Sequence, residues 1–230
     1  MTQNFEEIYE RIQKAKSKAG RTDKIFFTAV SKTRAVEEMK EAEKISWVDF
    51  FGENRVQEAE SKRASYPDSK IKWRLIGHLQ NNKARKAVEI FDSIDSVDSI
   101  ELALRLNRIA EEINKKIPIL IEVNTSGEES KSGVKPENFS QLLDVAIAQE
   151  NLKLDGLMTV GPLTDDEKKI RNSFATLRGM IENARATTRL PLPILSMGMS
   201  DDFELAILEG STMVRIGTLL FGKRFYQNKN

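Results

Sequence analysis

Short apolar runs rich in β-branched and aromatic residues alternate along the chain with longer amphipathic segments. Eight of these runs predict strands. Two of them, ILIEV at 119–123 and VRIGTLLF at 214–221, are apolar almost throughout, as is typical of strands buried on both faces. The predicted strands are Ile25–Ser31, Val48–Gly52, Lys72–Gly77, Ser93–Val97, Pro118–Asn124, Leu154–Val160, Pro193–Met197 and Met213–Phe221.

Segments with helical periodicity lie before and between these strands. Thr33, Ser99 and Thr164 are the expected N-caps of three of them, and Thr164 forms a capping-box pattern with Glu167. The predicted helices are Phe5–Lys18, Arg34–Ile45, Val56–Ser65, Asn82–Ile90, Ile100–Lys116, Phe139–Gln149, Lys168–Arg185 and Asp201–Glu209.

Regular alternation of strands and helices predicts a parallel sheet. Eight units favour closure into a (β/α)8 TIM-type barrel over an open doubly wound sheet, and 230 residues is an ordinary length for one such barrel. The helix Phe5–Lys18 is extra to this count. No segment rich in Pro, Gly or Ser divides the chain, so residues 1–230 are predicted to form a single domain.

Composition excludes several classes of function. The 36 basic and 35 acidic residues leave a net charge of +1, which provides no field for nucleic acid or an anionic membrane. The absence of cysteine excludes disulfides and thiolate metal sites, and a lone histidine is a weak metal ligand. The apolar runs are too short to span a bilayer, and the first 20 residues lack a signal-peptide core, so we expect a cytoplasmic protein with no metal.

The end of the first predicted strand places Lys32 at the mouth of the barrel, where functional groups of parallel barrels gather. Desolvation there would lower the pKa of its amine, and a neutral amine can form an imine. Most lysines are simply solvated, so Lys32 alone carries little weight. At the second and third strand tips, Gly52 permits a tight turn or a close backbone approach, and Asn54 offers an amide. His78 is more typical of a structural residue than of a general base.

The seventh and eighth predicted strands suggest an anion site. Ser196, Gly198 and Ser200 end one strand directly before a helix, and Gly217 and Thr218 offer further donors on the next. Arg215 lies in an otherwise apolar strand and needs a partner, either a ligand or an aspartate. Strands one and eight are neighbours in a closed barrel, so the site suits a phosphorylated aldehyde or ketone, in a phosphosugar aldolase or a pyridoxal phosphate protein.

Seven motifs, in order from residue 29 to residue 222, resemble those of the pyridoxal phosphate homeostasis protein (YggS/PROSC) family. That family is similar in fold to the N-terminal barrel of alanine racemase, a fold-type III pyridoxal phosphate protein. The motifs are AVSKTR, FGENRVQE, WRLIGHLQNNK, SIDSVDS, EVNTSGEESKSGV, LDGLMTVGP and LSMGMSDDFELAILEGSTMVRIGTLLFG. One departure is Arg74-Leu75, where a His-Phe pair is common.

The resemblance implies that pyridoxal 5′-phosphate forms a covalent Schiff base with Lys32 and that Asn54 lies near the ring. It further implies that Arg215 meets the ring nitrogen or lies beside the phosphate. The residues that it assigns to the phosphate are Ser200, Gly217 and Thr218, with backbone groups from Ser196 to Met199.

Two functions fit this site: a carrier that buffers pyridoxal phosphate and delivers it to apo-enzymes, or an amino-acid racemase. Racemisation needs a base on each face of the ring, and alanine racemase takes the second from a domain that has no counterpart here. The three tyrosines, Tyr9, Tyr66 and Tyr226, are predicted to lie away from the strand tips. These points favour a monomeric carrier without strong catalysis.

Overall fold

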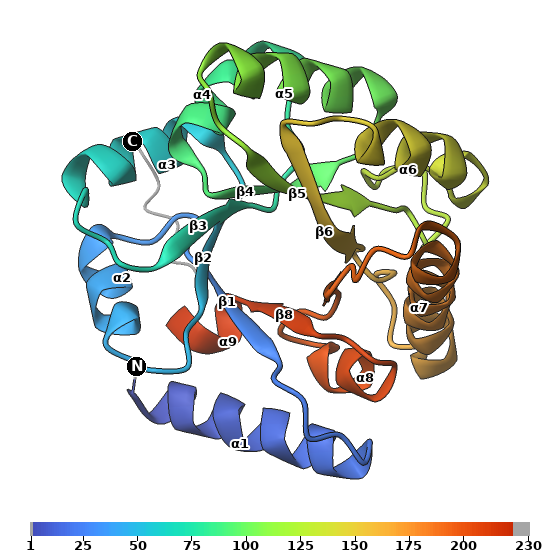
Figure 1. The fold of residues 1–230 in the computed structure, drawn as a ribbon. Helices are drawn as coiled ribbons and strands as arrows, with labels where there is room; N and C mark the ends of the chain where they lie inside the picture. Colours follow the sequence, from blue (N-terminus) through green and yellow to red (C-terminus); the bar gives the residue numbers. More distant parts are fainter. Residues whose placement is uncertain (1, 223–230) are drawn as a thin grey trace.

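The computed structural model describes residues 2–222, and its eight strands close into one parallel barrel (Figure 1). Each strand pairs with the next, and β8 pairs with β1 to complete the ring. The predicted barrel is therefore confirmed. The strands are β1 (Phe26–Val30), β2 (Phe50–Glu53), β3 (Lys72–Leu75), β4 (Ser93–Val97), β5 (Ile117–Glu122), β6 (Leu152–Met158), β7 (Ile194–Ser196) and β8 (Met213–Ile216).

Helices surround the barrel and cover the outer face of its strands (Figure 1). Two 3-10 turns, η1 (Asn81–Lys83) and η2 (Pro136–Asn138), lead into α4 and α6. The helices are α1 (Thr2–Lys18), α2 (Val36–Glu43), α3 (Val56–Ser65), α4 (Ala84–Ile90), α5 (Ile100–Glu112), α6 (Phe139–Ile147), α7 (Glu167–Thr188), α8 (Phe203–Leu208) and α9 (Thr218–Phe221).

The predicted eighth strand is too long. The observed strand β8 ends at Ile216, and residues 218–221 of the predicted strand form the short helix α9. Gly217 precedes this helix, and its carbonyl accepts hydrogen bonds from the N–H groups of Leu220 and Phe221, at 3.0 and 2.9 Å. A buried strand and a buried helical turn are equally apolar, so periodicity cannot separate them.

Helix capping agrees with prediction at one of three positions. The Ser99 hydroxyl accepts the N–H of Leu102 at 3.2 Å, as expected. Thr33 is not an N-cap: it lies in the left-handed region, with φ 64°, and α2 begins three residues later. Its place is taken by Ala35, whose N–H donates to the Glu38 carboxylate at 3.0 Å.

The long helix α7 is capped by Asp166 rather than by Thr164. The Asp166 carboxylate accepts the N–H groups of Lys168 and Lys169, at 3.0 and 3.3 Å. Thr164 instead accepts the N–H of Asp166, at 3.2 Å. Aspartate and threonine are both good caps, and the geometry of the preceding loop decides which of them reaches the helix.

The barrel interior has two layers because side chains two positions apart on a strand point the same way. The first is an apolar floor, formed by Leu120, Met158, Ile194 and Met213 with Phe26 and Phe50 packed against them. Two residues further on, Glu122, Ser196 and Arg215 make a polar layer, all of them buried. The polar layer forms the base on which a site at the carboxyl ends can rest.

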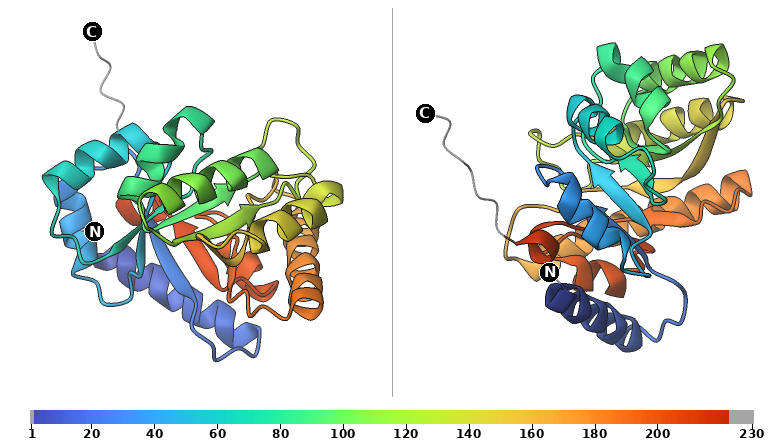
Figure 2. Two further views of the ribbon diagram at one scale, coloured as in Figure 1. Left: turned by 45° about the horizontal axis from the view of Figure 1, so that its top comes forward. Right: turned by 90° about the vertical axis from the view of Figure 1, so that its left-hand side faces the viewer.

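The extra helix α1 packs beside α8 at the seam between β1 and β8 (Figures 1 and 2). Its buried face is formed by Phe5, Ile8, Ile12 and Ala15. Phe5 meets Trp47 edge-on with ring centroids 5.5 Å apart. The helix thus covers the place where the first and last strands meet.

Candidate functional site

A cavity of about 360 Å³ opens at the carboxyl ends of the strands. Seven of the eight residues predicted from the sequence line it. They are joined by five residues that the sequence did not single out for the site: Val30, Arg34, Ile76, Val160 and Asp201. The predicted lining residues are Lys32, Asn54, Met199, Ser200, Arg215, Gly217 and Thr218.

Lys32 follows β1 by two residues and is partly exposed within the cavity. Strand β1 pairs with β8 in the register Ala29 with Ile216, so Lys32 and the β8 end reach the same space. A side chain at Gly217 would place its Cβ 3.2 Å from the Cβ and the carbonyl of Val30. The bare backbone at Gly217 therefore allows the two strand ends to approach closely.

Arg215 is almost fully buried, at 3% exposure, and its guanidinium lies at the cavity base. It donates to the Ser196 hydroxyl and to the Thr159 carbonyl, both at 2.7 Å. Both of these partners are neutral, so the two hydrogen bonds do not neutralise the charge of the guanidinium. Burial lowers the pKa of Arg215, and the nearby Glu122 carboxylate opposes that effect.

Ser196 lies behind the cavity lining and supports Arg215. It is fully buried on β7, and the Met158–Ser196 register aligns it with the end of β6. The sequence assigned it, through the family resemblance, to the phosphate region. Its observed contact is with the guanidinium.

The β7–α8 loop is held in a tight turn over the cavity. Gly198 adopts φ 95°, and a side chain there would place its Cβ 2.6 Å from that of Ala206. The Asp202 carboxylate accepts the N–H of Met199 at 2.6 Å, and burial raises the pKa of that carboxyl. Helix α8 begins at Phe203, two residues later than predicted, because Asp202 closes this turn instead of entering the helix.

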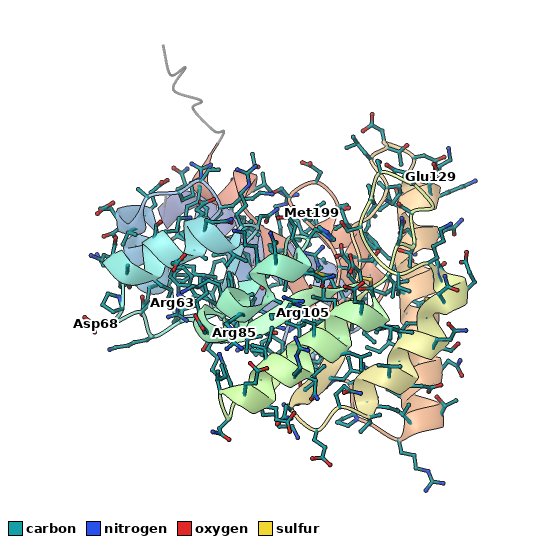
Figure 3. The ribbon with its side chains drawn as sticks, turned by 90° about the horizontal axis from the view of Figure 1, so that it is seen from above. Arg63, Asp68, Arg85, Arg105, Glu129 and Met199 are labelled. Atoms are coloured by element: carbon teal, nitrogen blue, oxygen red, sulfur yellow. The ribbon has the colours of Figure 1, made fainter. Side chains whose placement is uncertain are left out.

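The loops after β7 and β8 are joined at Ser200. Its hydroxyl accepts the N–H of Leu219 at 3.4 Å. Ser200, Gly217 and Thr218 therefore line one side of the cavity together. In Figure 3, Met199 marks this end of the barrel, and Glu129 of the β5–α6 loop lies toward the same end.

Asn54 follows β2 directly and faces the cavity. Its Oδ1 is buried and has no hydrogen-bond partner among the described residues. A buried amide oxygen without a donor costs free energy of about 1–3 kcal/mol. A ligand that donates a hydrogen bond at this point would recover that cost.

Gly52, on the same strand, faces the barrel interior. A Cβ at this position would lie 2.8 Å from the Thr28 methyl group and 2.9 Å from Ile76 Cδ1. Two side chains, rather than another stretch of backbone, therefore approach Gly52 closely, and the residue lies within β2 rather than in a tight turn.

Ile76, directly after β3, lines the cavity. Arg74 points into the barrel and forms a buried bidentate pair with Asp95, at 2.7 and 2.8 Å. His78 lies on the surface with its Nδ1 3.1 Å from Asp98 Oδ2 and does not line the cavity. Arg74, where the sequence departs from the family pattern, is therefore paired with Asp95 and does not line the cavity.

The tyrosines of the described residues lie away from the cavity, as predicted. Tyr9 on α1 packs against Trp47, with ring centroids 5.4 Å apart. Tyr66 follows α3 directly and donates to Glu43, and burial together with that carboxylate raises the pKa of Tyr66 to about 12. Tyr226 lies outside the described residues.

Within residues 2–222 the structure supports neither a metal site nor a membrane-spanning helix. Their His, Asp and Glu side chains form no group of three that could hold a metal ion. Their helices are each too short or too polar to cross a membrane.

The sequence model of the family described as alanine racemase, N-terminal domain, matches residues 4–224. A relative from Aquifex aeolicus, named pyridoxal phosphate homeostasis protein, is 41% identical over 95% of this chain and 96% of its own. A relative of the same name from Vibrio alginolyticus is also 41% identical, over 97% of each chain.

Solved structures agree with these relatives. PipY of Synechococcus elongatus, solved with PLP bound, is 37% identical, with a TM-score of 0.81 over 93% of this chain and 99% of that one. An alanine racemase from Clostridium difficile is 20% identical, with a TM-score of 0.73, and this chain spans 55% of it. The racemase thus shares the barrel fold.

Proposed function

Because this chain belongs to the alanine racemase N-terminal domain family, among relatives named pyridoxal phosphate homeostasis proteins, we propose that it binds pyridoxal 5′-phosphate and acts in its homeostasis. In this proposal Lys32 holds the cofactor covalently, as a Schiff base. The cofactor, when bound, supplies an aldehyde that condenses reversibly with an amine.

One observation carries the proposal: an amine and a set of hydroxyl and backbone groups converge on one cavity from adjacent strands. Lys32 follows β1, Gly217 and Thr218 follow β8, and Ser200 follows β7. A phosphate held by the latter three residues would leave the aldehyde end within reach of the lysine. The unpartnered Oδ1 of Asn54 fits a ring substituent that donates a hydrogen bond.

Arg215 adds a cation at the base of the cavity. In the proposed complex it meets either the ring nitrogen or the phosphate. A guanidinium opposite the ring nitrogen would keep that nitrogen unprotonated and weaken the ring as an electron sink. This supports holding and release of the cofactor over catalysis.

Within this proposal the protein is a monomeric carrier of the cytoplasm, formed by one barrel domain. It buffers the cofactor and hands it to apo-enzymes. The cavity opens at the mouth of the barrel, where an acceptor can reach the bound cofactor. Metal and nucleic acid have no part in this function.

The experiment is to mix the purified protein with pyridoxal 5′-phosphate and record the near-visible absorption band of the lysine adduct. Borohydride reduction and peptide mass mapping should place the adduct on Lys32. The variant Lys32→Ala should lose both the band and the mass shift, while Lys153→Ala, at an exposed lysine of β6 outside this cavity, should keep them. A band that survives in Lys32→Ala would refute the covalent assignment.

The racemase alternative is tested separately. L-amino acids incubated with the loaded protein should yield no D-isomer at an enzymatic rate. Turnover at about 1 s⁻¹ or faster would contradict the carrier function.

A further inference from the structure

The two residues that flank Lys32 are both anchored to one buried network. On one side, the Ser31 hydroxyl donates to Glu53 Oε1 at 2.7 Å. On the other side, the Thr33 N–H donates to the Glu58 carboxylate. Lys32 therefore sits between two fixed points on a turn whose outer residue, Thr33, has a left-handed φ of 64°.

Lys62 of α3 joins these anchors. Its ammonium lies 2.7 Å from Glu53 Oε1 and 2.7 Å from Glu58 Oε1, and it donates to the Ser31 carbonyl, also at 2.7 Å. The side chain is only 9% exposed. A lysine is seldom buried to this extent unless it is paired, so its three short contacts account for its position.

The network depends on the charge of Lys62. Glu53 is completely buried, and its Oε2 has no hydrogen-bond partner among the described residues. Burial raises the pKa of Glu53, and the Lys62 ammonium is the main group that opposes this rise. Without Lys62, two carboxylates and the Ser31 carbonyl would lose their common donor.

We propose that Lys62 is a positioning residue for Lys32: it fixes the β1–α2 turn through Ser31, Glu53 and Glu58 so that the Lys32 amine enters the cavity ready to react. The inference rests on the proposed function and adds to it a second lysine, which does not itself touch the cofactor. Thr33 is β-branched and strained in the left-handed region, so the turn would relax if its anchors were removed.

The test separates capture of the aldehyde from binding of the phosphate. Capture is measured as the rate at which the absorption band and the borohydride-fixed Lys32 peptide form with pyridoxal 5′-phosphate. Binding is measured as the affinity for pyridoxine 5′-phosphate, which has an alcohol in place of the aldehyde. Lys62→Met should slow capture by about tenfold, since small misplacements of a reacting group are costly, and should change analogue affinity by less than about twofold.

A matched control is available at the other end of the barrel. Lys115 is also partly buried and donates to two backbone carbonyls, those of Val88 and Phe91, at 2.6 and 2.8 Å. Lys115→Met makes the same chemical change away from the cavity. It should lower thermal stability while leaving the capture rate unchanged.

Loss of Lys62 alone leaves buried carboxylates unpaired and endangers folding. The double variant Lys62→Met with Glu53→Gln removes the Lys62–Glu53 charge pair while an amide oxygen remains to accept the Ser31 hydroxyl. It should fold and still capture slowly. Wild-type capture in a folded double variant, or an equal loss of analogue affinity, would overturn the inference. Failure of the unaltered protein to form any Lys32 adduct would instead refute the proposed function.

Discussion

Glu122 is a buried carboxyl group whose pKa is raised strongly above its ordinary value. It lies on β5 in the polar layer, is 4% exposed, and its Oε2 has no partner among the described residues. Burial, together with the nearby Asp98 and Asp95, raises its pKa from 4.5 to about 7 against the opposing charge of Arg215. The proton on this group is therefore linked to folding.

The variant Glu122→Gln tests this linkage. Between pH 4.5 and about 7 the folded state binds the Glu122 proton more tightly than the unfolded chain does, so wild-type stability falls as pH rises through this interval. Glutamine keeps the neutral form. The variant should match the wild type below pH 4.5 and exceed it by about 2–3 kcal/mol at pH 8, as measured by urea unfolding.

The control is Glu128→Gln on the surface. The Leu163 N–H and Lys131 lower the pKa of Glu128, so this carboxylate stabilises the folded state when it is ionised. The control should therefore show the opposite sign, with any loss of stability appearing above the titration of Glu128. Identical pH profiles for wild type and Glu122→Gln would show that Glu122 is not buried in its neutral form.

Ser196 and Ser200 have different tasks, although both were assigned to the phosphate region. Ser196→Ala removes an acceptor from the buried Arg215 and should cost about 1–3 kcal/mol of stability. Ser200→Ala should cost little stability but weaken pyridoxine 5′-phosphate binding by about tenfold, the effect of one lost charge-assisted hydrogen bond. Thermal unfolding and titration of the analogue distinguish the two. The reverse pattern would place Ser196 rather than Ser200 at the phosphate.

At the scale of elements, the N-terminus of α7 gives a direct contrast between two caps. Asp166→Ala removes the acceptor for two helix N–H groups and should lower stability by about 1 kcal/mol. Thr164→Ala removes a hydrogen bond in the preceding loop and should cost less than about 0.5 kcal/mol. Chemical denaturation measures both. A larger cost at Thr164 would mean that the capping box expected from the sequence is present in solution.

The sequence predicts the elements better than their ends. Apolar runs locate all eight strands, because a parallel barrel buries both faces of each. The end of β8 was missed because Leu219 and Leu220 are as apolar in a helical turn as in a strand. The cap at Asp166 was missed because the direction of a loop depends on tertiary packing.

In the candidate site, too, some residues could be predicted from the sequence and others depend on tertiary packing. Lys32, Ser200 and Thr218 were predictable because strand ends of a parallel barrel converge at one mouth. Glu122 and Lys62 were not. A glutamate at a strand end and a lysine in a helix rich in Glu, Ala and Lys both look solvent-exposed, and only the packed barrel shows that they are buried.

At the scale of the whole molecule, α1 connects the first and last parts of the barrel. It packs beside α8 and α9, and Arg11 forms a bidentate pair with Glu204 of α8 at 3.1 and 2.9 Å. Phe5 lies fully buried against Trp47, which in turn meets Phe27 of β1 edge-on at 4.6 Å. The helix thus stabilises closure of the ring.

Phe5→Ala should therefore destabilise the whole barrel by about 3 kcal/mol, the usual cost of deleting a buried phenyl ring. The loss should appear as one cooperative transition, seen equally by the fluorescence of Trp47 and Trp73 and by circular dichroism. Tyr9→Ala, at an exposed neighbouring position on α1, should cost much less. An early fluorescence transition, separate from loss of helix, would mean that α1 unfolds on its own.

The apolar floor of the barrel determines by which route a bound molecule can be exchanged. Leu120, Met158, Ile194 and Met213 pack together inside the barrel, which is therefore not an open channel, so a bound molecule enters and leaves by the same opening. An acceptor must then approach from the side on which the departing molecule still lies. Transfer by direct displacement would depend on acceptor concentration, and loss into bulk solvent would not.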